Sequence, residues 1–193
     1  MSVPIEFGYT GSYTAGAHGL VPATVTPGTV VQDPDQTFDP TDGFSTAIPI
    51  TVADAALLRV AMPPDAVADP AVDLDLYLYD PSGNQVASST NGGTNEKIDV
   101  TSPATGTWTL YVHGWQAGST GSTTFSLYSW LIPAAAGGGN LAITSAPTSA
   151  TLGTTGTVTA SWTGAATAWN LGAISHTGDG ELMGLTLLEV DNR

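Results

Sequence analysis

The clearest alternation of hydrophobic and polar residues lies at positions 72–80, Val-Asp-Leu-Asp-Leu-Tyr-Leu-Tyr-Asp. Leu74, Leu76 and Leu78 alternate there with aspartate and tyrosine, which is the period of two typical of a strand with one buried face. Residues 107–113 repeat the pattern with Trp108, Leu110 and Val112 on one side. We therefore expect residues 72–80 to form the central strand of a β-sandwich.

Shorter runs of the same kind recur along the chain, separated by turn residues. We expect further strands at residues 5–9, 13–25, 44–52, 57–62, 85–88, 97–100, 124–131, 141–145, 157–163, 168–175 and 182–190. The chain contains 23 Gly and 13 Pro, and no stretch sustains the apolar spacing of three and four residues that a helix needs. The predicted fold class is all-β: a jelly-roll or Ig-like β-sandwich followed by a second, smaller Ig-like β-domain.

Residues 134–140, Ala-Ala-Ala-Gly-Gly-Gly-Asn, break the composition sharply and predict a flexible linker. The predicted domains are therefore residues 1–133, a sandwich that includes the N-terminal strands, and residues 141–193, the small β-domain. A piece this short buries little surface alone, so it is expected to pack on its neighbour or to be a reduced Ig-like domain. Residues 7–11 and 160–164 also resemble each other weakly. Two copies of a strand–turn–strand unit would explain this similarity, and so would chance.

The charge balance narrows the possible partners. The chain has 17 acidic residues against Arg59, Lys97 and Arg193, a formal net charge of −14 at pH 7. Such a surface is repelled by phosphate backbones and anionic membranes, so we expect no nucleic-acid partner. No apolar run reaches the ~18 residues needed to insert into a membrane. Met1 is followed by Ser-Val-Pro-Ile-Glu-Phe, which is no signal peptide, so a secretion signal is expected outside this segment.

Residues 32–43, which we call the acidic loop, are the best metal candidate. Two prolines exclude regular structure there, and calcium prefers six to eight oxygen ligands, which carboxylates and freed carbonyls can supply. The alternative is a solvated turn whose aspartates cap backbone amides. A second pair projects from one face of the central strand, either capping the adjacent loop or joining a metal site. The candidate calcium ligands are Asp33, Asp35, Asp39, Asp42, Asp73 and Asp75.

Aromatic residues offer the other candidate binding surface. If Trp108, Leu110 and Val112 point inward, the alternate positions of that strand and of the central strand point outward. Outward aromatic side chains can stack on sugars or hold an extended polypeptide, or they can be covered by the second domain. The candidate ligand-binding residues are Tyr77, Tyr79, Tyr111, His113 and Trp115.

Catalytic signatures are missing from the sequence. Nucleophilic catalysis requires a serine or cysteine beside a base that is oriented by an acid. The chain has no cysteine, no Gly-x-Ser-x-Gly elbow and no subtilisin-type Gly-Thr-Ser-Met motif, and its histidines lie in strand-like or turn-like sequence. We therefore expect this chain not to be an enzyme.

The order of motifs resembles the bacterial pre-peptidase C-terminal domain. The resemblance lies in residues 73–80, in Gly-Asn at 83–84, in Ala-Thr-Gly-Thr-Trp-Thr-Leu-Tyr-Val at 104–112 and in Thr-Phe-Ser-Leu at 124–127. Residues 113–115 and 171–191 are similar to the C-terminal regions of actinobacterial subtilisin-like serine peptidases.

This resemblance implies a non-catalytic, extracellular module that aids stability, secretion or attachment to an insoluble protein such as collagen. Its expected partner is the catalytic domain of the same parent protein. Two other functions fit the residues: a carbohydrate-binding or adhesive module, and a purely structural spacer.

Overall fold

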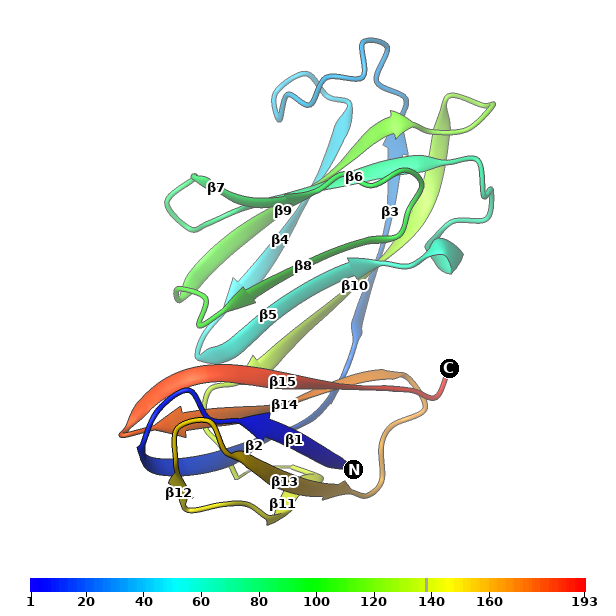
Figure 1. Cartoon of the computed structure of the whole chain (residues 1–193). Helices are drawn as coiled ribbons and strands as arrows, with labels where there is room; N and C mark the ends of the chain where they lie inside the picture. Colours follow the sequence, from blue (N-terminus) through cyan, green and yellow to red (C-terminus); the bar gives the residue numbers. More distant parts are fainter. Residues whose placement is uncertain (138) are drawn as a thin grey trace. The chain divides into compact units, whose positions relative to one another are not determined.

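The computed structural model describes residues 1–137 and 139–193 and is built almost entirely of antiparallel strands. It divides into two compact units, residues 24–131 and residues 1–23 with 132–193 (Figure 1). Within the described residues no helix is long or apolar enough to cross a bilayer. The predicted all-β class, with sandwich-like antiparallel sheets, is confirmed.

The unit formed by residues 24–131 contains two four-stranded sheets, ordered β4-β9-β6-β7 and β3-β10-β5-β8. A short 3₁₀ turn, Pro64–Ala66, follows the strand Ala55–Met62. The strands are β3 (Thr24–Val31), β4 (Ser45–Val52), β5 (Ala55–Met62), β6 (Asp73–Tyr79), β7 (Gln85–Ser89), β8 (Glu96–Thr101), β9 (Gly106–Gln116) and β10 (Ser122–Pro133), the last two residues of which belong to the other unit.

The core of this unit lies where the inward faces of its two sheets meet. The predicted leucines of β6, Leu74, Leu76 and Leu78, are fully buried, as are Leu110 and Val112 of β9. They belong to one hydrophobic cluster with inward residues of the other sheet, namely Leu58, Val60, Met62, Phe125 and Leu127. The alternation read from the sequence therefore does mark the buried face of β6 and β9.

The other unit also holds two sheets, ordered β1-β13-β11 and β12-β2-β14-β15. Phe7, Tyr13, Val158 and Ile174 are among the buried residues of its separate core. The strands are β1 (Ser2–Glu6), β2 (Gly11–Pro22), β11 (Leu141–Ser145), β12 (Ser149–Ala150), β13 (Thr155–Trp162), β14 (Trp169–Gly178) and β15 (Glu181–Asp191).

This grouping differs from the predicted division into residues 1–133 and 141–193. Strand β1 pairs with β13, and β2 pairs along almost its whole length with β14, so the N-terminal strands complete the sheets of the C-terminal segment. The physical reason is the small size of the C-terminal segment, because its own strands are too few to bury a core. Residue 138 of the predicted linker lies outside the described residues.

The weak sequence repeat falls inside this same unit. Residues 7–11 connect β1 to β2, and residues 160–164 lead from β13 towards β14. In both copies the first strand belongs to one sheet and the second strand to the other, and the corresponding strands pair with each other. This arrangement agrees with two copies of a strand–turn–strand unit.

Candidate functional site

The acidic loop joins β3 to β4, and main-chain hydrogen bonds near both of its ends attach it to β9. The amide of Asp33 donates to the carbonyl of Gly114 (2.8 Å), and the Gly114 amide donates to the carbonyl of Phe44 (3.2 Å). A Cβ atom at position 114 would collide with the main-chain carbonyl of Val31, so glycine is required for this close approach. The loop is therefore held against the outward side of the sheet β4-β9-β6-β7.

A buried histidine lies between two carboxylates beneath this loop. His113 is fully buried, and its Nε2 lies 2.8 Å from Oδ2 of Asp33, which is 1% exposed. Its Nδ1 lies 3.5 Å from Oδ2 of Asp75, which is 6% exposed. The strand register explains the second contact, because Asp75 and His113 are direct cross-strand partners on β6 and β9.

The electrostatics of this group favour an ion pair. Burial favours a neutral imidazole, but the carboxylates of Asp75 and Asp33 outweigh it and raise the pKa of His113 above its usual value. Burial likewise opposes the charge on Asp33, but hydrogen bonds with His113 and with the amide of Asp35 outweigh it and lower the Asp33 pKa. A charged His113 thus links the acidic loop to the sheet.

An aromatic cluster forms the second attachment of the loop. Phe38 stacks on Tyr77 with ring centroids 3.7 Å apart and planes 5° from parallel. It also meets Tyr79 at 6.4 Å, Tyr111 at 5.8 Å and His113 at 5.7 Å. The predicted outward aromatic face therefore exists, but the loop's own phenylalanine occupies it. Burial, followed by the neighbouring Asp75 charge, raises the pKa of Tyr77 to about 12.

The other aspartates of the loop cap backbone amides two residues ahead. Each accepts a hydrogen bond through Oδ1 at 2.8–2.9 Å: Asp35 from the amide of Thr37, Asp39 from that of Thr41, and Asp42 from that of Phe44. This is the geometry of the solvated, amide-capping turn that is the alternative to a calcium site. Among the described residues no group of three or more His, Asp or Glu is placed to hold a metal. Calcium binding stays a prediction.

The aspartates of β6 line a pocket of about 360 Å³. Asp73 and Asp75 form its acidic side, while Tyr77 and Trp115 supply aromatic surface. The remaining walls are polar and come from two loops: Gln36, Thr90, Asn91 and Gly92. Four of the eleven predicted site residues therefore meet in one pocket, whereas Asp35, Asp39 and Asp42 do not line it.

A β-bulge shapes this pocket. On β6, Asp73 and Asp75 are two residues apart, but their partners on β9, Gln116 and His113, are three apart. The extra residue on β9 changes the direction of the side chains there and places Trp115 in the pocket wall. The Trp115 carbonyl accepts hydrogen bonds from the side-chain amides of Gln32 (2.6 Å) and Gln36 (3.2 Å), which fix this segment.

Glu96 fixes the opposite wall. Its carboxylate, 1% exposed as a residue, accepts from the main-chain amide of Asn91 at 2.7 Å and from the Asn91 side chain at 3.1 Å. Burial raises the pKa of Glu96, although hydrogen bonds with Ser89 and Asn91 act in the opposite direction. Burial and then the charge of Asp75 also raise the pKa of Asp73.

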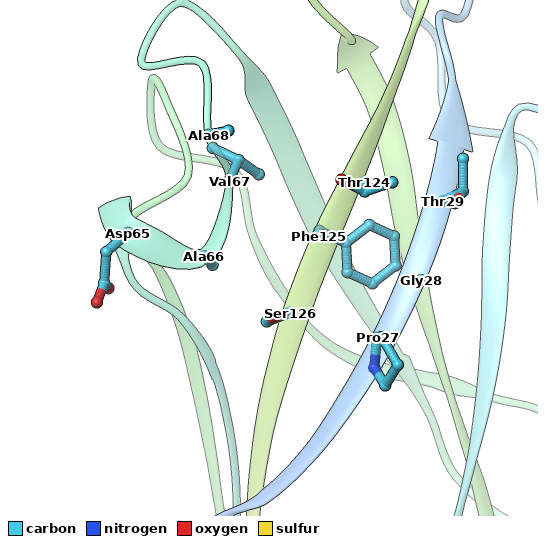
Figure 2. Close-up of a pocket in the computed structure, with 10 residues that line it drawn as sticks. All are labelled: Pro27, Gly28, Thr29, Asp65, Ala66, Val67, Ala68, Thr124, Phe125 and Ser126. Atoms are coloured by element: carbon cyan, nitrogen blue, oxygen red, sulfur yellow. The ribbon is translucent and has the colours of Figure 1, made fainter. Parts of the chain in front are cut away.

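A larger cavity of about 510 Å³ lies elsewhere in the unit, beside β3, β10 and the 3₁₀ turn. Figure 2 shows the rings of Phe125 and Pro27 together, while the carboxylate of Asp65 points away from them. The cavity's other lining residues are Gly, Ala, Val, Ser and Thr. None of the eleven predicted site residues lines it.

The other two histidines lie in the unit of residues 1–23 and 132–193. Nε2 of His18 is 3.0 Å from Oγ of Ser175, but its Nδ1 faces the carbonyl of Pro133 (2.8 Å) instead of a carboxylate. His176 lies between the hydroxyls of Tyr13 (2.6 Å) and Thr186 (2.8 Å), and burial lowers its pKa. Both histidines therefore act as hydrogen-bonding groups between strands.

Several residues of the site were not singled out from the sequence. Phe38 was overlooked because an isolated aromatic residue in a polar loop has no periodic neighbours. Glu96 and Asn91 lie at a predicted turn and strand start, where polar residues are usual. Gln32 and Gln36 act through long side chains whose partners, at β9, are about 80 positions away in sequence. The unusual number of aspartates around Phe38 was the one available signal.

Residues 48–114 match the family model of the bacterial pre-peptidase C-terminal domain. The match runs from β4 to Gly114 in β9, so it includes β6 and most of both sheets but not the acidic loop. The resemblance read from the sequence is thereby confirmed for this part of the chain.

Among known proteins, pyrolysin of Pyrococcus furiosus, a subtilisin-like peptidase, is 42% identical over 62 residues. Those residues are 30% of this chain and 4% of pyrolysin. Two solved structures are similar at a TM-score of 0.40. The pre-peptidase C-terminal domain of a Bacillus anthracis collagenase has 15% identity and covers 56% of this chain and 89% of that one. The Yersinia pseudotuberculosis-derived mitogen has 12% identity and covers 61% and 92%.

Proposed function

We propose that this chain is a non-catalytic accessory module of a secreted subtilisin-like serine peptidase and that it attaches the enzyme to insoluble protein substrate. The observation that carries the proposal is the family match over residues 48–114, together with the identity to pyrolysin. The partner in this account is the catalytic domain of the same parent protein, and the location is extracellular.

The histidine contacts agree with a chain that is not catalytic. His113 is enclosed by two carboxylates and an aromatic cluster, so its ring serves to fix the acidic loop. The Ser175–His18 contact has a main-chain carbonyl where a serine hydrolase has a carboxylate. A carbonyl holds the ring but offers no charge to stabilise an imidazolium.

The aromatic contacts favour protein over polysaccharide as the substrate surface. Stacking on sugars requires an accessible aromatic face. Phe38 occupies the face of Tyr77 and contacts Tyr79 and Tyr111, so these rings are engaged within the module. Trp115, half-exposed, instead lies next to two aspartates.

Sedimentation of the purified chain with insoluble materials tests the proposal. We expect the chain to sediment with collagen, elastin or keratin particles and to remain in solution with cellulose and chitin. Trp115→Ala is expected to reduce retention, whereas Trp162→Ala, a half-buried tryptophan of the other unit, serves as the matched control. Retention on polysaccharide alone would instead support the carbohydrate-binding alternative, and retention on nothing would support a spacer.

An activity assay tests the non-catalytic part. The chain alone is expected to leave casein intact. Casein hydrolysis by the purified chain that a serine-directed inhibitor blocks would contradict the proposal.

A further inference from the structure

We call the pocket lined by Asp73, Asp75, Tyr77 and Trp115 the β6 pocket. Its walls are preorganised by hydrogen bonds within the protein. Hydrogen bonds from Gln32 and Gln36 hold the main chain at Trp115. On the other side, the buried Glu96 carboxylate holds Asn91 through two hydrogen bonds. A site whose walls are fixed in this way loses little conformational entropy on binding.

One carboxylate oxygen at the pocket accepts no hydrogen bond from the described part of the protein. Oδ1 of Asp73 is shielded from solvent, yet it has no hydrogen-bond partner within residues 1–137 and 139–193. Asp73 lines the pocket, so its carboxylate is within reach of a ligand there. Asp75 is 94% buried. Among the described residues its cationic neighbour is His113, and the two side chains are 3.5 Å apart.

The charge around the pocket is strongly negative. Asp73 and Asp75 line it, and Glu96 lies behind Asn91 in its wall. Among the described residues, the positive charge that contacts Asp75 is that of His113. That charge is shared with Asp33, its closer partner at 2.8 Å. An entering cation would therefore meet a carboxylate pair that the protein neutralises only in part.

The aromatic walls distinguish between kinds of cation. Calcium prefers six to eight oxygen ligands, and Tyr77 and Trp115 replace such ligands with ring surface over part of the pocket. Ring faces attract guanidinium and ammonium groups and also pack against the methylene stems of arginine and lysine. The amide side chains of Gln36 and Asn91 add acceptors for the remaining N–H groups.

We propose that the β6 pocket binds an arginine or lysine side chain of an extended polypeptide. The ammonium or guanidinium group donates to Asp73 and Asp75, and its stem packs against Trp115, beside the part of Tyr77 that Phe38 leaves uncovered and that lines the pocket. This inference rests on the proposed function, because it names the feature of a protein substrate that the module recognises.

Titration of the full chain with a capped Gly-Gly-Arg-Gly-Gly peptide, followed by calorimetry and by amide NMR shifts, tests the proposal. We expect shifts at residues 90–92 and at the Trp115 indole. The same peptide with citrulline, which has arginine's shape without its charge, is expected to bind at least about tenfold more weakly, as the loss of a charge-assisted hydrogen bond implies. This comparison needs no variant of the protein.

Two substitutions with equal change in charge complete the test. Asp73→Asn nearly preserves the shape of the side chain and is expected to weaken the arginine peptide about tenfold. Asp54→Asn removes an exposed carboxylate in the β4–β5 turn, at the Gly106 end of β9 and far from His113, and is expected to change affinity less than about twofold.

Three results would overturn the proposal: equal binding of the arginine and citrulline peptides, an unchanged affinity in Asp73→Asn, or calcium displacing the peptide while shifting the same amides. The last would make the pocket a metal site. Retention on insoluble protein that is unaffected by Asp73→Asn would refute the pocket and leave the proposed function standing. Binding of the arginine peptide without retention on any insoluble protein would refute the proposed function and leave the pocket standing.

Discussion

Replacing Asp33 by asparagine tests whether the buried ion pair with His113 holds the acidic loop. Removing one partner of a buried pair costs about 3–5 kcal/mol, but asparagine keeps a hydrogen-bond acceptor, so we expect a loss of about 2–3 kcal/mol in the free energy of unfolding. Asp42→Asn is the matched control in the same loop, because Asp42 is exposed and caps only the amide of Phe44. Its expected cost is below about 1 kcal/mol.

The difference between wild type and Asp33→Asn should depend on pH with a definite sign. The pKa of His113 is raised above 6.5, so its contribution is complete below pH 6.5 and is lost as the pH rises through the higher, folded-state pKa. The pKa of Asp33 is lowered below 3.8, so its contribution is present above pH 3.8 and is lost as the pH falls through the lower pKa. The difference in the free energy of unfolding is therefore greatest between pH 3.8 and pH 6.5.

Urea unfolding at several pH values, followed through the NMR intensities of β6 and β9 amides, measures this difference. Reading those strands restricts the measurement to the unit of residues 24–131, which matters because two units need not unfold together. An Asp33→Asn cost no larger than that of Asp42→Asn would show that the ion pair with His113 does not hold the acidic loop. A cost that stays constant as the pH rises through the titration of His113 would lead to the same conclusion.

Three further predictions concern the loop and its attachment. Phe38→Ala removes the stacking on Tyr77 and should lower the free energy of unfolding by about 1–2 kcal/mol while the Tyr77 pKa falls from about 12 towards 10, as an NMR titration of that tyrosine would measure. Gly114→Ala forces a Cβ against the Val31 carbonyl and should cost more than about 2 kcal/mol in urea unfolding, whereas Gly184→Ala, with no atom within 4 Å, should change stability by less than about 0.5 kcal/mol. Calcium binding to the acidic loop predicts heat and a thermal shift when the EDTA-treated protein is titrated with millimolar calcium, and neither signal should appear if the loop binds none.

The sandwich core could be predicted from sequence because its signal is local. Leu74, Leu76 and Leu78 lie on one strand, and their burial follows from the two-residue period of that strand. The same rule places Asp75 and Tyr77 on the opposite face, which is also where the structure has them. What the period does not reveal is what covers that face.

The acidic loop covers it, and this depends on contacts between residues distant in sequence. Asp33 and His113 are 80 positions apart, and nothing in the local sequence of either indicates the other. Asp75 and His113 were expected on an outward face, and they are buried because the loop lies over that face. Covering of the aromatic residues was foreseen, but by a second domain and not by Phe38.

The division of the chain was hard to predict for a similar reason. Which strand pairs with which is decided by edges and cores far apart in sequence, and β1 and β13 are separated by about 150 positions. The small size of the C-terminal segment indicated only that it packs on its neighbour or is a reduced domain, and not which strands complete its sheets. The weak repeat at residues 7–11 and 160–164 falls in the two segments whose strands pair, but a similarity this weak does not by itself indicate pairing.

The decisive experiment for a substrate-attachment module is retention of the purified full chain on insoluble protein, measured as the fraction that sediments with collagen, elastin or keratin compared with cellulose and chitin. We expect retention on protein particles, release by the arginine-containing peptide and no release by its citrulline counterpart. Retention on polysaccharide alone, or on none of these materials, would contradict this function.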